Sequence, residues 1–271
     1  MENGIKIKEL LQNSDYLRTR IYDRYVAYDH RYVTGTYEER GLHAVENLKK
    51  KFPFYKNIVW RYYPPNHRQR YMLIKDQFGE YLNGSLADIG TRENVLSEIM
   101  ERPVALIDKN NPNLPSFDWD KDRLPFADNS FDAVVCLDTL EHINDIHECF
   151  RDLLRISKRY VIISLPNNWR RLIRGLIKGY GTSVAYGIPL IKPMDRHRWF
   201  FNTEEAEDFF FYNSAAANPP AEVQKVRYYV PTTIPRHRII YPLLRRFLPL
   251  AHFKNFVVHT IFVCLEKRQK P

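Results

Sequence analysis

Aspartates stand at or just after several short apolar runs that favour β-strands. In an open α/β sheet, ligands bind beyond the carboxyl ends of the strands. Carboxylates at that edge accept hydrogen bonds from hydroxyl and amino groups and attract cations. Taken singly, each acid could be a helix cap or a solvated strand end, but their joint placement indicates a ligand-binding site. The acids are Asp88, Asp108, Asp120 and Asp138.

The elements that would position these acids alternate between strands and helices. Continuous apolar runs without polar alternation are typical of a parallel sheet buried on both faces. Helical spacing of apolar residues separates two of these runs, over 146–156. We expect strands at 86–89, 104–107, 133–137, 161–165, 224–230 and 257–265, and helices at 15–33, 37–48, 93–100 and 203–212, the last capped by Thr203.

A turn follows the first predicted strand, and it contains Gly90. A glycine there lets the backbone approach a ligand closely. Asp108 ends the second strand about 20 residues after the first, where an acid typically binds ribose hydroxyls. The pattern therefore favours a nucleoside-containing ligand.

Three stretches together resemble class I S-adenosylmethionine-dependent methyltransferases, in particular bacterial type 11 members. They are LADIG (86–90), ALID (105–108) and LPFADNSFDAVVCLDTLEH (124–142). The stretches 160–166 and 196–206 are also similar to bacterial members. The resemblance covers roughly residues 84–215 and the last strand pair. It implies an α/β fold with a Rossmann-like seven-stranded sheet whose last strand is antiparallel.

The resemblance also implies a cofactor, S-adenosyl-L-methionine, and residue roles. An oxygen acceptor would need a base, for which His142 is the candidate; alternatively, His142 is a structural residue at a helix start. His197 lies between Arg196 and Arg198, which suggest binding of an anionic substrate. The implied cofactor-binding residues are Asp88, Gly90 and Thr91 near the methionine portion, Asp108 at the ribose, Asp120 at the adenine amino group, and Leu137 and Asp138 at a strand end.

One departure from the family pattern concerns the glycine-rich loop. The family's loop usually has three glycines in the order Asp-x-Gly-x-Gly-x-Gly, whereas this chain has Asp88-Ile-Gly-Thr-Arg-Glu-Asn94. Two interpretations follow. Either the loop is reshaped and still binds the cofactor, which the intact downstream block favours, or the chain is a non-catalytic relative that acts as a binding or membrane-associated protein.

Positive charge is concentrated in two segments. The 271-residue chain has 41 Lys and Arg against 32 Asp and Glu, a net charge of +9. Residues 167–202 have seven bases and one acid, and residues 231–256 have five bases and no acid. Both are apolar as well as basic, with amphipathic helical spacing. Each could be a lid helix with a solvated basic face, or could lie on an anionic membrane surface.

These basic insertions suggest the class of acceptor. We expect a small-molecule, sugar or lipid-linked glycan acceptor that is anionic. An RNA acceptor is the alternative. It is less favoured, because the bases stand among aliphatic side chains rather than aromatic stacking platforms.

The change in composition along the chain predicts its domain organisation. We expect a helical N-terminal extension over 1–80 and a methyltransferase domain over 81–271, with insertions at 167–202 and 231–256.

The three cysteines are far apart in apolar runs, which indicates a reducing compartment. No zinc-ligand spacing is present, so no metal site is predicted. No apolar run is long enough to span a bilayer, which needs roughly 20 residues. We expect a cytoplasmic protein, with peripheral contact to the inner face of a membrane as an alternative.

Overall fold

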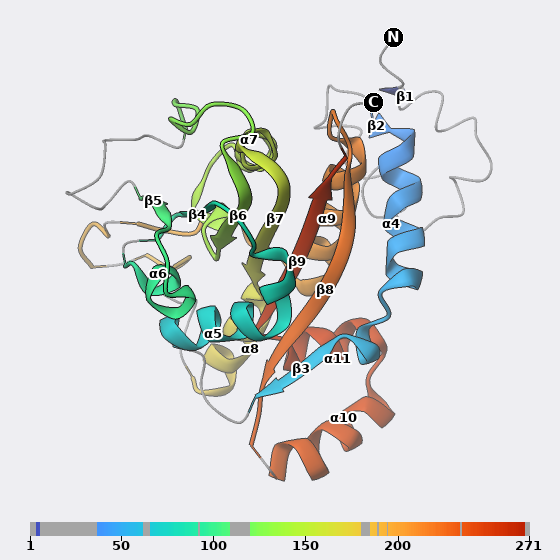
Figure 1. The fold of residues 1–271 in the computed structure, drawn as a ribbon. Helices are drawn as coiled ribbons and strands as arrows, with labels where there is room; N and C mark the ends of the chain where they lie inside the picture. Colours follow the sequence, from blue (N-terminus) through green and yellow to red (C-terminus); the bar gives the residue numbers. More distant parts are fainter. Residues whose placement is uncertain are drawn as a thin grey trace.

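A seven-stranded sheet forms the centre of the molecule (Figure 1). The computed structural model describes residues 4–5, 37–61, 66–91, 93–108, 120–179, 185–188, 190–193, 195–233 and 235–268. The strand order is β3-β8-β9-β7-β6-β4-β5. Only β9 is antiparallel to its neighbours among these strands. The strands are β3 (Ile58–Arg61), β4 (Leu86–Ile89), β5 (Ala105–Ile107), β6 (Phe131–Leu137), β7 (Ser157–Pro166), β8 (Ala221–Pro231) and β9 (Thr260–Lys267); β1 (Gly4–Ile5) and β2 (Tyr37–Glu38) form a separate pair.

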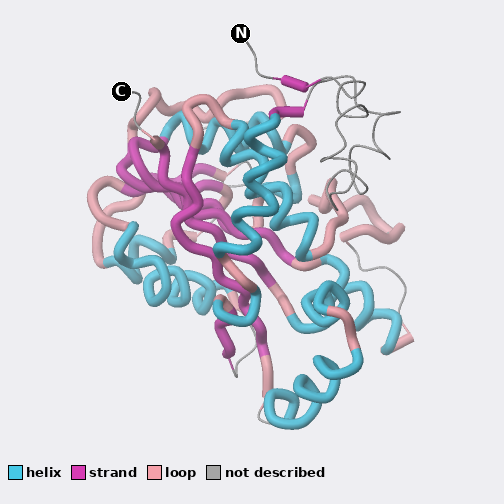
Figure 2. The backbone as a smooth tube through the Cα atoms, turned by 90° about the vertical axis from the view of Figure 1, so that its right-hand side faces the viewer, coloured by secondary structure: helices cyan, strands magenta, loops and turns pink. Residues whose placement is uncertain are grey.

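Helices cover both faces of this sheet (Figure 2). Side chains alternate along β6, so Val134 and Cys136 contact one apolar cluster while Ala133 and Val135 contact the other. The first cluster contains residues of α4, α7, α9 and α11, and the second contains residues of α5 and α6. The helices are α4 (Glu39–Lys51), α5 (His67–Phe78), α6 (Val95–Met100), α7 (Ile146–Ile156), α8 (Asn168–Ile177), α9 (Thr203–Ala216), α10 (Tyr241–Phe247) and α11 (Leu250–Val257), with short turns η2 (Phe54–Lys56), η3 (Gly79–Tyr81), η4 (Leu140–His142) and the π-helical η5 (Arg236–Ile240).

The architecture agrees with the seven-stranded sheet and antiparallel last strand that the resemblance implies, and six of the seven strands lie where the sequence predicted them. Several boundaries differ by a few residues, and two of these differences change the role of a residue. Val257 ends α11, and the last strand begins only at Thr260. Asn202, not Thr203, caps α9, because its side chain accepts hydrogen bonds from the amides of Glu204 and Glu205. The helix predicted over 15–33 lies outside the described residues.

The N-terminal part contributes a strand as well as helices. β3 pairs in parallel with β8 at the edge of the sheet, with Trp60 opposite Val230. Sequence reasoning missed this strand, since its four residues carry no clear alternation and stand inside a region with helical spacing. Trp60 also stacks on Tyr241, with ring centroids 5.7 Å apart. β3 therefore holds the second basic insertion against the sheet.

The two basic insertions follow β7 and β8 at the carboxyl edge of the sheet. The first includes α8, and the second includes η5, α10 and α11. In Figure 1, α10 lies at the bottom, below the sheet. None of the helices that the structure describes is both long enough and apolar enough to span a bilayer.

Candidate active site

Two predicted site segments meet where β4 and β5 end. The amide of Gly90 donates to the carbonyl of Ile107 at 2.8 Å, which brings the loop after β4 against Asp108. Asp108 is buried. Gly90 has a φ of +84°, and a Cβ atom added to it would lie 2.3 Å from Cγ2 of Thr139, which follows β6. A side chain at position 90 would therefore be strained and would clash.

Asp88 is a buried acid beneath this loop. Its side chain is fully buried, and neither carboxylate oxygen has a hydrogen-bond partner of ordinary geometry. Burial raises the pKa of Asp88 to about 7, and the nearby hydroxyl of Tyr71 on α5 opposes the rise. A buried carboxylate without partners is costly. It would be satisfied by a cationic or hydrogen-donating ligand.

Asp138, the residue directly after β6, has a strained backbone conformation with a φ of +47°. Its carboxylate forms an ion pair with Arg70 of α5 and accepts a hydrogen bond from the Ser164 hydroxyl at 2.6 Å. Leu137, directly before it, is buried. Non-glycine residues with positive φ are uncommon and cluster at functional sites.

Asp120 binds the segment that follows η4. Its carboxylate accepts hydrogen bonds from the amide and the side-chain nitrogen of Asn144, at 2.8 and 2.6 Å. Asn144 stands between η4 and α7, so these bonds connect Asp120 to the segment after β6.

The loop that lacks two family glycines is fixed to α5. Within it, the Thr91 hydroxyl donates to the Glu93 carbonyl at 3.0 Å. The Glu93 carboxylate lies 3.1 Å from Nδ1 of His67 at the start of α5. Sequence reasoning missed the contribution of α5, including Arg70 and Tyr71, because this helix precedes the motif and no residue spacing connects it to the strand ends.

The predicted histidines meet next to the end of β6. His142 is in η4, and its ring centroid lies 4.6 Å from that of His197. The loop carrying His197 binds η4 through its backbone, since the amide of Arg198 donates to the Glu141 carbonyl at 2.7 Å. The guanidinium of Arg196 donates to the Gly187 carbonyl at 2.8 Å and so supports the loop.

Burial changes the ionisation of two groups here. Burial, and then His142, lower the pKa of His197 to about 4, so its imidazole is neutral at physiological pH. Glu141 was not predicted as a site residue. Burial, and then Asp138, raise the pKa of its carboxyl well above the ordinary value.

An arginine cluster from both basic insertions lies beside the site. Arg170 of α8 is buried, and its Nε has no hydrogen-bond partner. Burial and the neighbouring Arg174, with a smaller effect of Arg236, lower its pKa to about 10. Among the described residues, no carboxylate forms an ion pair with Arg170, Arg174 or Arg236. The sequence showed that both insertions are basic, but not that their arginine side chains lie close together.

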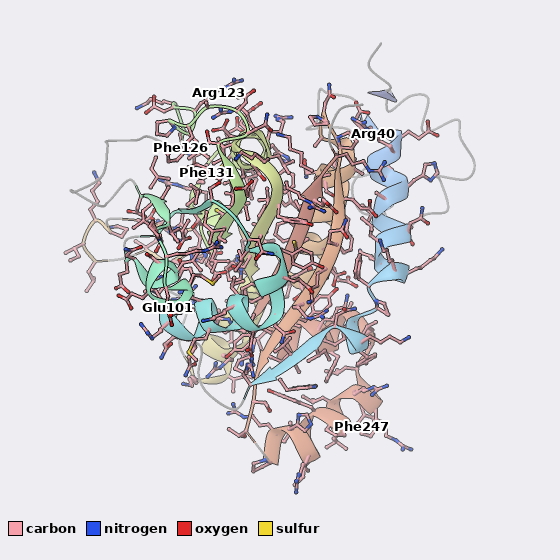
Figure 3. The ribbon with its side chains drawn as sticks, viewed as in Figure 1. Arg40, Glu101, Arg123, Phe126, Phe131 and Phe247 are labelled. Atoms are coloured by element: carbon pink, nitrogen blue, oxygen red, sulfur yellow. The ribbon has the colours of Figure 1, made fainter. Side chains whose placement is uncertain are left out.

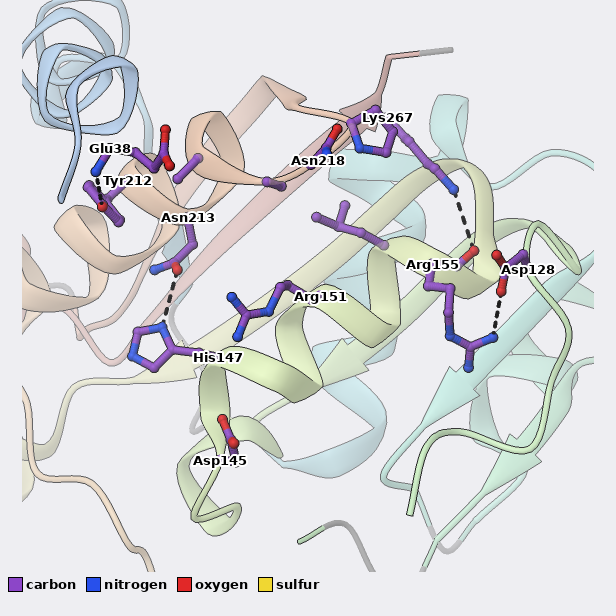
Figure 4. A pocket seen from close by; sticks show the side chains of 14 residues that line it. Glu38, Asp128, Asp145, His147, Arg151, Arg155, Tyr212, Asn213, Asn218 and Lys267 are labelled. Carbon is purple, nitrogen blue, oxygen red and sulfur yellow. Dashed lines mark hydrogen bonds and ion pairs between the residues drawn. The ribbon is translucent and has the colours of Figure 1, made fainter. Parts of the chain in front are cut away.

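Figure 4 shows a different cavity, of about 820 Å³, between α7 and α9. Its polar side chains largely bind one another, as Arg155 does Asp128 at 3.0 Å and His147 does Asn213 at 3.2 Å. None of the predicted site residues lines it. The predicted site residues lie elsewhere, at or near the carboxyl edge of the sheet.

The comparison with protein families agrees with this geometry. The model of the methyltransferase domain family matches residues 81–164, which hold β4 to β7 and the predicted acids. Over that segment, the match agrees with the predicted resemblance to S-adenosylmethionine-dependent methyltransferases. This match is consistent with S-adenosylmethionine, the cofactor that the sequence resemblance implies. The orphaned carboxylate of Asp88, the buried Asp108 and the close backbone at Gly90 suit a sulfonium cation with ribose donors.

Solved structures of methyltransferases are similar in fold to parts of the chain. A methyltransferase from Archaeoglobus fulgidus is 14% identical, covers 82% of this chain and 99% of its own, and has a TM-score of 0.48. Magnesium protoporphyrin IX methyltransferase from Synechocystis, with bound S-adenosylhomocysteine, is 12% identical, covers 74% of this chain and 84% of its own, and has a TM-score of 0.44. A methyltransferase from Mesorhizobium loti is 13% identical, covers 72% and 96%, and has a TM-score of 0.43. No curated protein matches the chain.

Proposed function

We propose that this protein transfers a methyl group from S-adenosylmethionine to an anionic small-molecule, sugar or lipid-linked glycan acceptor. The observation that supports this acceptor class is the arginine cluster at the carboxyl edge of the sheet. Arg170 is buried and Arg174 and Arg236 stand near it, without carboxylate partners among the described residues. Converging unpaired guanidinium groups favour phosphate or carboxylate groups as ligands.

The cofactor side of the site is formed by the acids. S-adenosylmethionine supplies a methyl group on a sulfonium sulfur, already activated for transfer. Asp108 would accept from the ribose hydroxyls, Asp88 would lie near the methionine portion, and Asp120 would accept from the adenine amino group. Asp138 is held at the strand end by Arg70 and Ser164. Positioning of the two reactants then supplies much of the rate enhancement.

A base for an oxygen acceptor would come from the histidine pair. His142 Nδ1 lies 3.2 Å from the Asp195 carboxylate, within ion-pairing distance. A carboxylate beside an imidazole favours the protonated ring that forms when a base takes a proton, which supports the predicted role of His142 as a general base.

A peripheral membrane location is supported by a separate observation. Large apolar side chains of the two basic insertions face solvent. Phe247 of α10, labelled in Figure 3, is 71% exposed. The others include Leu176, Ile177, Ile239 and Leu243. An exposed apolar surface rimmed by arginines suits an anionic lipid surface, where a lipid-linked acceptor would be found.

Calorimetry and methyl labelling test the proposal. We expect the full chain to bind one S-adenosylmethionine, and no binding at millimolar cofactor would indicate the non-catalytic alternative. With tritium-labelled cofactor in detergent solution, label should enter anionic glycans or glycolipids from a cell extract. Label that only ribonuclease releases would contradict the acceptor class and favour the RNA alternative, for which binding should fall steeply with salt.

A pair of double variants tests the arginine cluster. Arg170→Gln with Arg174→Gln should keep cofactor affinity and lower transfer at least about tenfold, because hydrogen bonds to charged groups contribute about 1.5–3 kcal/mol each. The matched control is Arg238→Gln with Arg246→Gln, which removes two exposed arginines of the second insertion and should leave transfer in detergent unchanged. Equal losses in both variants would contradict a specific anion site.

A further inference from the structure

Three side chains with metal-ligating atoms converge beside the end of β6. Glu141 and His142 come from η4, and His197 comes from the loop before α9. One ligand atom from each lies within 4.8 Å of the other two. The two segments are held together by backbone contacts, because the Arg198 amide donates to the Glu141 carbonyl and Trp199 Nε1 donates to the Ile143 carbonyl, both at 2.7 Å.

Outer partners set the orientation of both imidazoles. The Tyr186 hydroxyl donates to the Trp199 carbonyl at 2.8 Å, so it accepts from Nδ1–H of neutral His197, also at 2.8 Å. Nε2 of His197 then presents its lone pair. In His142, Nδ1 faces the Asp195 carboxylate at 3.2 Å, and Nε2 lies 3.9 Å from Glu141 Oε1. Metal-ligating histidines almost always have a polar partner at their other ring nitrogen, as His197 has in Tyr186 and His142 has in the Asp195 carboxylate within ion-pairing distance.

Glu141 supplies the second observation. Its side chain is only 2% exposed, and Oε2 has no hydrogen-bond partner. Such a buried, unpartnered carboxylate is expensive unless a cation or donor binds it. Its burial next to two oriented imidazoles is thus explained by a ligand that all three share.

We propose that Glu141, His142 and His197 together bind one divalent first-row transition-metal ion. Two imidazole nitrogens and one carboxylate oxygen suit zinc, manganese, iron or cobalt better than magnesium or calcium, which prefer oxygen ligands. Three protein ligands leave coordination positions open. The spacing rule that excluded a metal site from the sequence missed this set, because two ligands are adjacent in sequence and the third comes from a distant loop.

The role of the ion rests on the proposed function. Asp138 directly follows the strand that leads into η4, so the three ligands stand next to the predicted cofactor residues. An acceptor hydroxyl that binds the ion's open position would have a lower pKa. Its proton would then pass to water, and the cluster would replace His142 as the means of deprotonation.

Metal binding can be measured without cofactor or acceptor. The full chain, stripped with chelator, is titrated with Zn²⁺ or Mn²⁺ by calorimetry and with Co²⁺ by visible absorption. We expect one ion per chain at micromolar or lower concentration. Glu141→Gln and His197→Gln should each weaken binding at least tenfold while keeping calorimetric S-adenosylmethionine affinity, which shows that the variants fold.

A surface pair provides the matched control. His43 and Glu39 lie 3.6 Å apart on α4 but are exposed. His43→Gln should leave metal binding unchanged. Absence of binding at 1 mM ion, or binding that His43→Gln removes and Glu141→Gln does not, would overturn the site. Metal binding in a protein that transfers no methyl group would support the site and count against the proposed function, so the two failures are distinct.

Discussion

Burial of a carboxyl group at the strand ends lowers the stability of the ligand-free protein. Asp88 has no hydrogen-bond partner of ordinary geometry and a pKa of about 7. Above that pH it is an ionised carboxylate in an apolar environment. The free energy of folding is therefore less favourable than it would be with a neutral residue at position 88. Binding of a cationic cofactor would offset this cost.

Asp88→Asn should stabilise the ligand-free protein in a pH-dependent manner. The folded-state pKa is raised above the ordinary value of 3.8, so the contribution of Asp88 is most favourable below about pH 4 and declines as pH rises to about 7. Urea unfolding should show an advantage of the variant that is about 2–3 kcal/mol larger at pH 8 than at pH 5. Cofactor affinity should fall. An advantage independent of pH would contradict the shifted pKa.

At the scale of elements, α5 acts as a support for the strand ends. It contributes Arg70 to the ion pair with Asp138, His67 to the contact with Glu93, and Arg68 to a pair with Glu98 at 2.7 Å. The first pair is largely buried, whereas the Arg68 pair is exposed on both sides. These contacts hold a loop that has only one of the family's three glycines.

The two arginines of α5 should therefore differ in importance. Arg70→Gln leaves the Asp138 carboxylate without its cation and should cost about 3 kcal/mol of stability, the lower end for breaking a buried pair. Arg68→Gln breaks an exposed pair and should cost less than about 1 kcal/mol. Urea denaturation of both variants measures the difference. If the two costs were equal, Asp138 would not depend on α5.

For the whole molecule, the net charge of +9 is local in origin. The cofactor-binding part contains the buried acids, whereas the excess of bases lies in the two insertions at the carboxyl edge of the sheet. Figure 1 shows α10, in the second insertion, extending below the sheet. Apolar side chains there are exposed together with arginines. This arrangement favours a contact of this one face with an anionic lipid surface over a general affinity for polyanions.

Liposome flotation should detect that contact. We expect the protein to float with vesicles containing anionic phospholipid and not with neutral vesicles, since each basic residue near the surface contributes about 1 kcal/mol. Ile239→Asp with Phe247→Asp should abolish flotation. The control Met72→Asp alters an exposed apolar residue of α5, 56% accessible, and should float normally. Loss in both variants, or equal flotation with neutral vesicles, would contradict the membrane contact.

The sequence alone predicted six of the seven strands of the central sheet and the acids that stand at their ends. Strands over 86–89 and 133–137 and the helix over 146–156 were predicted because their apolar patterns are local and continuous, and the acids follow these strands directly. Only the tertiary structure shows the contacts between segments that are far apart in sequence. These are the pairing of β3 with β8, the ion pair of Arg70 with Asp138, and the association of Glu141 and His142 with His197. These contacts join residues far apart in sequence, and local propensity carries no information about which distant surfaces meet.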